Sequence, residues 1–249
     1  MYILFWKNKY IIFDDKMGEN MIKKYYKIAI VLLMFLSLFI LTGCGDNSEE
    51  LLNEKISSEL EYIENVIFRI VKKYMSNEYL VEETIDWNSI RSDFEDLNKT
   101  SNVIITDFSL KNIDKEDILK FEELLNIINI RIEEENDITF LIALSDFYSL
   151  IPNYQYKYFD YNADISIKLI KNLNLYSIIS CMNGDFDNAI TLLEQAEKEY
   201  VNLMKDTKYL EDNAYYVNRI YVVLQEFKIS LNETNLNLAI VKYLNTLGI

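Results

Sequence analysis

The sequence contains no histidine and very little proline or glycine. Its 249 residues include one Pro, five Gly and two Cys. Without His, the Ser-His-Asp and Cys-His nucleophiles, HExxH zinc sites and His-ligated iron sites are all excluded. Tight β-turns draw on Gly and Pro, so their scarcity favours long helices joined by short connections. We therefore expect an all-α fold with no catalytic residue, no metal site and no cofactor.

The two cysteines are Cys44 and Cys181. Because Cys44 lies in a processing signal described below, no intramolecular disulfide is expected in the mature domain. Cys181 is surrounded by Ile178, Ile179 and Met182. These neighbours predict a buried apolar side chain and not a reactive thiol.

Acidic residues outnumber basic ones, 40 to 25, for a net charge of -15. Residues 1–43 are net basic, so the rest of the chain is more acidic still. Such a surface repels nucleic-acid phosphates, which argues against nucleic acid as a partner. We interpret the acidity as a means of staying soluble and not as a docking face.

Residues 21–43 have the layout of a bacterial signal peptide. A basic stretch at 21–27 precedes an apolar run at 28–41, which is broken only by Ser37. A membrane-spanning helix needs about 20 apolar residues, so this run is better sized for a cleaved signal. The next residues, Leu41-Thr42-Gly43-Cys44, resemble the lipobox of bacterial lipoproteins. That resemblance implies cleavage between Gly43 and Cys44 and a diacylglyceryl group on Cys44.

The lipobox implies that membrane lipid is a partner of the chain through acylated Cys44, on the outer face of the cytoplasmic membrane. Two acyl chains suffice for stable anchoring. In the alternative interpretation, Cys44 is a chance cysteine beside a slightly short transmembrane helix. The basic residues before that helix would still place residues 44–249 outside, so both interpretations export the domain.

Residues 1–20 fit no part of a signal peptide, because Asp14, Asp15 and Glu19 precede the basic stretch. The pair Gly18-Glu19 can be encoded by a purine-rich ribosome-binding stretch just upstream of Met21. We therefore expect translation to start at Met21 and residues 1–20 to be a mis-assigned extension.

Hydrophobic periodicity after Cys44 predicts seven to eight helices. Residues 44–50 form a short tether, 51–76 a first helix starting near 48, 77–86 a join, and 87–249 a helical domain. The later helices are expected at 86–108, 114–133, 137–150, 162–182, 185–205, 209–231 and 234–247. Short connections imply antiparallel neighbours, hence a bundle or a stack of helical hairpins.

Local signals mark the ends of these helices. Asp86, Asp114 and Asn162 are suited to cap helix N-termini. Pro152 should stop or kink the helix at 137–150, because proline cannot donate the helical hydrogen bond. Gly184 should close the helix at 162–182 in a left-handed conformation.

Three further patterns are weak. Residues 160–164 begin like an EF-hand loop, but Ile165 and Lys171 stand where its glycine and glutamate belong, so we interpret them as a capping loop. Residues 184–196 resemble half of a tetratricopeptide repeat, yet no second copy lies 34 residues away. The tyrosines at 148–161 could line a cleft, although filling the end of a bundle is the simpler interpretation.

The lipobox, the helix start Trp87-Asn88-Ser89-Ile90, the proline-ended helix and the final helical pair resemble uncharacterised helical-bundle lipoproteins of low-GC Gram-positive bacteria. Apart from the lipobox the resemblance is a loose pattern over 87–249, and it implies export and anchoring with no activity. We expect a non-enzymatic interaction or ligand-binding module, with an envelope protein as a conceivable partner. The alternatives are a carboxylate-based enzyme acting on envelope polymers and a tetratricopeptide-like adaptor.

Metabolic labelling tests the anchoring. Radiolabelled palmitate should appear on the protein and be lost in Cys44→Ala, since the thiol is the predicted site of acylation. N-terminal sequencing of the unprocessed Cys44→Ala product should begin at Met21. An unlabelled wild-type protein recovered wholly from the cytosol would contradict the assignment.

Overall fold

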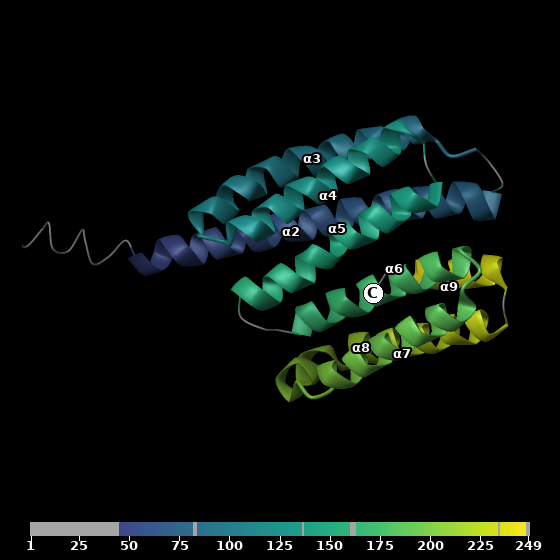
Figure 1. Ribbon diagram of the computed structural model, residues 1–249. Coiled ribbons are helices and arrows are strands. Elements are labelled where there is room, and N and C mark those ends of the chain that lie inside the picture. The colour runs from purple at the N-terminus through teal and green to yellow at the C-terminus, as the bar shows by residue number, and fades with distance from the viewer. Residues whose placement is uncertain (1–44, 82–83, 136, 160–162, 234, 248–249) are drawn as a thin grey trace, which may run out of the picture. The chain divides into compact units, whose positions relative to one another are not determined.

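The computed structural model describes residues 45–81, 84–135, 137–159, 163–233 and 235–247 (Figure 1). Throughout these residues the regular structure is helical, as predicted. The helices are α2 (Gly45–Met75), the π-helical η1 (Ser76–Val81), α3 (Trp87–Leu110), α4 (Lys115–Glu133), α5 (Asp137–Tyr158), α6 (Ala163–Met182), α7 (Phe186–Leu203), α8 (Thr207–Asn232) and α9 (Leu236–Thr246). Gly43, Cys44 and the expected cap Asn162 lie outside the described residues.

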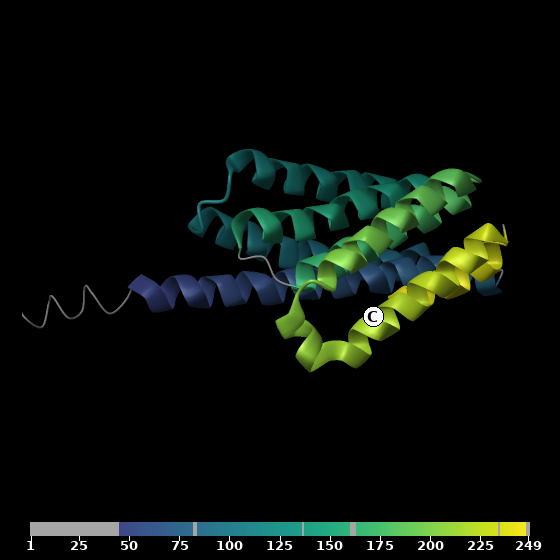
Figure 2. The same cartoon turned by 90° about the horizontal axis from the view of Figure 1, so that it is seen from below.

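A boundary between Leu52 and Asn53 divides the described part of the chain into two units. Within residues 53–249 the helices form two adjoining antiparallel groups (Figures 1 and 2). In the first group α3 packs on α4 and α4 on α5, while α2 joins through contacts such as the Phe68 and Tyr148 rings, whose centroids are 4.8 Å apart. The contact between α5 and α6 connects the two groups.

The second group, α6 to α9, is a closed four-helix bundle. Each helix packs on the next, and α9 returns to contact α6. A tetratricopeptide array instead stacks its hairpins into an open superhelix. Residues 184–196 therefore form the turn and the first part of α7 in a single helical hairpin made by α6 and α7. Between these two helices the buried Ser177 hydroxyl donates to the Ala189 carbonyl at 2.7 Å.

Side-chain caps begin most of the helices in the way the sequence predicts. The carboxylates of Asp86 and Asp114 accept from backbone N–H groups at 3.1 and 3.0 Å, each in the first turn of its helix. Gly184 has a φ of +80°, the left-handed conformation expected of it. These three predictions are confirmed. Asp185, Asp206 and Asn235 also cap helices.

The prediction that the helix at 137–150 ends near Pro152 is wrong, because α5 continues to Tyr158 with Pro152 inside it. A proline inside a helix removes one backbone hydrogen bond. Pro152 is nevertheless buried, and side-chain contacts with α4 hold the part of α5 that follows it. The Tyr154 hydroxyl donates to the Asp117 carbonyl, and Lys157 and Tyr158 bind the Asp117 carboxylate at 2.7 and 2.5 Å. Those contacts with α4 outweigh the local preference of the proline.

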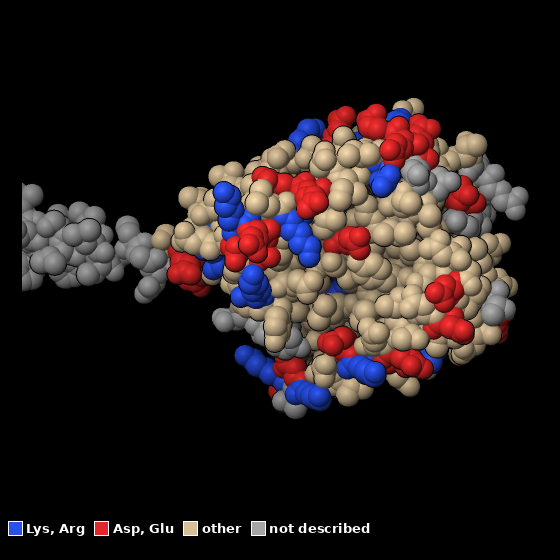
Figure 3. Space-filling view, viewed as in Figure 1, with Lys and Arg blue, Asp and Glu red and all other residues tan. Residues whose placement is uncertain are grey.

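The core is made of aromatic and aliphatic side chains from all the helices. The largest fully buried side chains are Tyr74, Tyr148, Tyr243, Phe108, Phe121, Phe140, Phe147, Phe227, Ile56, Leu60, Ile63 and Ile67. On the outside, acidic and basic groups are interspersed over the face shown in Figure 3. In the described part of the chain, the helices are too short or too polar to cross a membrane.

One pair of carboxylates lies where α2 meets α3. Lys55 Nζ lies 2.7 Å from Asp107 Oδ2 and 3.8 Å from Glu59 Oε1, so two acidic side chains share one cation. Burial, together with the neighbouring Asp107, raises the pKa of Glu59 to about 7. A carboxyl group with a raised pKa binds its proton more tightly in the folded chain than in the unfolded chain.

We therefore expect the folded state to lose stability through Glu59 as the pH rises from about 4.5 to about 7. Glu59→Gln, which mimics the protonated acid, should match the wild type in thermal midpoint at pH 4 and exceed it at pH 8. Calorimetry at the two pH values measures this. The exposed Glu95→Gln on α3 serves as the control, and an equal gain from it at pH 8 would contradict the assignment.

Candidate ligand-binding cleft

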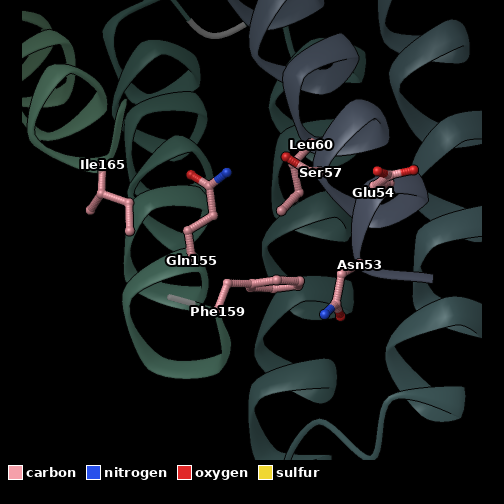
Figure 4. Close-up of a pocket in the computed structure, with 7 residues that line it drawn as sticks. All are labelled: Asn53, Glu54, Ser57, Leu60, Gln155, Phe159 and Ile165. Atoms are coloured by element: carbon pink, nitrogen blue, oxygen red, sulfur yellow. The ribbon is translucent and has the colours of Figure 1, made fainter. Parts of the chain in front are cut away.

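A cleft opens between α2, α5, α6 and α8. Its polar part has a volume of 380 Å³ and adjoins a more apolar part of 280 Å³, with Ser57 and Gln155 lining both. The polar part is lined by Ser57, Glu61, Glu64, Asn65, Gln155, Asp164, Ile167, Lys168, Lys171 and Tyr216. The apolar part adds Asn53, Glu54, Leu60, Phe159 and Ile165 (Figure 4).

Three charged side chains are buried together in the polar part. Glu64 on α2 is 5% exposed. Lys171 Nζ lies 3.0 Å from Glu64 Oε1, and Lys168 Nζ lies 3.9 Å from Glu64 Oε2. The two lysine side chains are only 14% and 12% exposed. The centre of the cleft therefore presents one anion and two cations to whatever enters.

Each lysine has a second partner that fixes its position. Lys171 Nζ also lies over the Phe68 ring, 5.5 Å from its centroid, and cation–π contacts extend to about 6 Å. Lys168 donates to Gln155 Oε1 at 3.1 Å. The two ammonium groups are thus held by α2 and α5 as well as by their own helix, α6.

The second oxygen of Glu64 lies beside Lys168, whose Nζ is 3.9 Å from Oε2. Oε2 is buried and accepts no hydrogen bond from any residue that the structure describes. The nearby Tyr148 hydroxyl donates instead to the Lys168 carbonyl at 3.3 Å. Burial, and then the charge of Glu64, raises the pKa of Tyr148 well above its usual value. Glu64 is therefore paired at both of its oxygens, with Lys171 at Oε1 and with the more distant Lys168 at Oε2.

The rim of the cleft is more acidic than its centre. Glu61 and Asp164 are exposed at the mouth. Tyr216 contributes a half-buried hydroxyl, whose pKa is raised to about 12 by burial and by the neighbouring Tyr209, Glu64 and Asp164. A ligand with a positive group is therefore attracted to the mouth before it meets the lysines.

The residues singled out from the sequence lie mostly elsewhere. Tyr154 and Tyr158 pack together and bind Asp117, and Tyr156 is 68% exposed, so these tyrosines end the bundle and do not line the cleft. Lys171, which breaks the EF-hand pattern, instead binds Glu64. Cys181 is buried as predicted, and burial raises the pKa of its thiol to about 11. No group of metal-binding side chains occurs in residues that the structure places.

Sequence reasoning missed the three buried charges, although a signal was present. Glu64 lies within the apolar stripe of α2, next to Ile63 and one turn after Leu60. Lys168 and Lys171 are the only charged residues of α6 after Asp164. A charge at a core position has to find an opposite charge or a ligand, so these three residues could have been paired in advance.

Comparison of the chain with protein-family models, with curated proteins and with solved structures gives no match.

The cluster of Glu64, Lys168 and Lys171 allows us to predict how substitutions change the free energy of unfolding. Lys171→Met should lower the free energy of unfolding by roughly 3 kcal/mol, because it leaves Glu64 buried with only the more distant Lys168. Adding Glu64→Leu should recover most of the loss, since no uncompensated anion then remains. Urea unfolding measures both. Lys242→Met breaks an exposed pair with Glu226 and should cost less than about 1 kcal/mol.

Proposed function

We propose that the protein is a membrane-anchored extracytoplasmic lipoprotein that binds a small polar ligand, without catalysis, in the cleft between α2, α5, α6 and α8. The observation that carries the proposal is the cluster of Glu64, Lys168 and Lys171, whose side chains are only 6%, 12% and 14% exposed although they line a cleft open to solvent. Anchoring is proposed at Cys44, on the strength of the lipobox Leu41-Thr42-Gly43-Cys44.

Energetics supports a binding role for the cluster. Replacing a buried ion pair by apolar side chains of similar volume is often neutral or stabilising. Glu64, Lys168 and Lys171 occupy positions among core residues of α2 and α6, where aliphatic side chains would pack at lower cost.

The form of the cleft supports the same role. Ligand pockets typically measure about 300 to 1,000 Å³ and combine apolar walls with a few convergent polar groups. The two parts of this cleft lie at the lower end of that range and divide in the same way. A ligand of a few to a dozen heavy atoms suits these volumes better than a polymer.

Thermal unfolding of the full-length chain in detergent tests the binding. Three probe sets are used: apolar L-amino acids, neutral sugars such as N-acetylglucosamine, and polyamines. A ligand that binds only the folded chain raises its midpoint, so one set should raise it. The rise should be lost in Glu64→Gln.

Glu197→Gln is the matched control. Like Glu64, Glu197 accepts from a lysine on another helix, Lys228, at 2.7 Å, but it lies outside the cleft. It should keep the wild-type response. The proposal fails if no probe set raises the midpoint, or if Glu64→Gln responds as strongly as the wild type.

A further inference from the structure

We propose, building on the proposed function, that the ligand of the cleft is an α-amino acid with an apolar side chain, bound as a zwitterion. Its carboxylate is held by Lys168 and Lys171, its ammonium group by Glu64, and its side chain by the apolar part around Phe159. Four features of the cleft lead to this class.

The first feature is the spacing of opposite charges. The anion and one of the cations of the cleft lie 3.0 Å apart, as Glu64 Oε1 and Lys171 Nζ. An α-amino acid carries its own anion and cation on a single carbon, at a comparably short separation. Such a ligand can place its carboxylate on the lysines and its ammonium group on the glutamate at the same time.

The second feature is the balance of charge, which disfavours ligands of a single sign. The lining holds four carboxylates, Glu54, Glu61, Glu64 and Asp164, against the two lysines. A simple anion would meet the lysines but would be repelled by those carboxylates. A simple cation would satisfy Glu64 but would be repelled by Lys168 and Lys171.

The third feature separates a zwitterion from a neutral sugar. Six charged side chains line the cleft and lose solvent when it fills, which is costly unless the ligand supplies opposite charges. Sugar hydroxyls can donate to Glu64 and accept from the lysines, but only as neutral hydrogen bonds. Charge-assisted hydrogen bonds are roughly twice as strong, so the zwitterion compensates better.

The fourth feature is the apolar part of the cleft. Leu60 on α2 and Ile165 on α6 line it, and the Phe159 ring lies below Gln155 and extends toward Asn53 (Figure 4). This part adjoins the charged centre through Gln155, whose Oε1 already accepts from Lys168. An apolar side chain attached to the carbon that carries both charges would reach it directly.

Isothermal titration of the full-length chain in detergent with leucine and two analogues tests the proposal. Isopentylamine lacks the carboxylate of leucine, and 4-methylpentanoate lacks its ammonium group. Leucine should bind, and each analogue should bind at least about tenfold more weakly. Isopentylamine leaves the two lysines without a carboxylate partner, and 4-methylpentanoate leaves Glu64 without an ammonium partner. N-acetylglucosamine is the neutral comparison.

Variants assign the two ends of the ligand. Glu64→Gln should weaken leucine at least about tenfold and leave 4-methylpentanoate unchanged or tighter, whereas Lys168→Met should leave isopentylamine unchanged or tighter. Glu197→Gln should match the wild type throughout. If Glu64→Gln does not fold, Asp164→Asn on the exposed rim replaces it and should weaken leucine about threefold.

The outcomes separate this inference from the proposed function. Binding of N-acetylglucosamine or a polyamine, but not leucine, in a Glu64-dependent manner overturns the amino-acid assignment and leaves the binding role standing. Equal binding of leucine and either analogue also overturns the assignment. Absence of binding by every probe overturns both.

Discussion

The structure depends on how Glu64, Lys168 and Lys171 are accommodated where the two groups of helices meet. These side chains bring charge from α2 and α6 into a region where their neighbours are apolar, and desolvation makes such charges costly unless they compensate one another. Compensation is incomplete, because two cations face one anion. The cleft stays open at the point where this imbalance lies.

The surrounding helices fix the positions of these charged side chains. Gln155 extends from the part of α5 that follows Pro152, so its position depends on the helix continuing past the proline. The contacts of Tyr154, Lys157 and Tyr158 with Asp117 on α4 secure that continuation. Packing between α4 and α5, away from the cleft, thus positions the Gln155 amide that orients Lys168. A common type of helical fold can support a specific site in this way.

Much of the fold could be predicted from the sequence, and little of the candidate site could. Helix caps such as Asp86 and Asp114 depend on neighbouring residues only, and the helical periodicity of apolar residues in α2 appears in the sequence itself. Both features could therefore be predicted from the sequence. The prediction that the helix ends near Pro152 failed because the contacts that stabilise α5 beyond this residue involve Asp117, which is far away in sequence. Glu64 and Lys171 are 107 residues apart, and only the folded chain shows that they are partners. The lipobox-like Leu41-Thr42-Gly43-Cys44 is a local signal of another kind, and the lipidation that it predicts at Cys44 stays a prediction.

The most direct test of the account is a crystal structure of the protein grown with leucine. The account predicts a leucine molecule in the cleft, with its ammonium nitrogen about 3 Å from the Glu64 carboxylate and its own carboxylate at a similar distance from Lys168 or Lys171 Nζ. A cleft closed by rearranged side chains, or a leucine bound with its carboxylate away from both lysines, would contradict it.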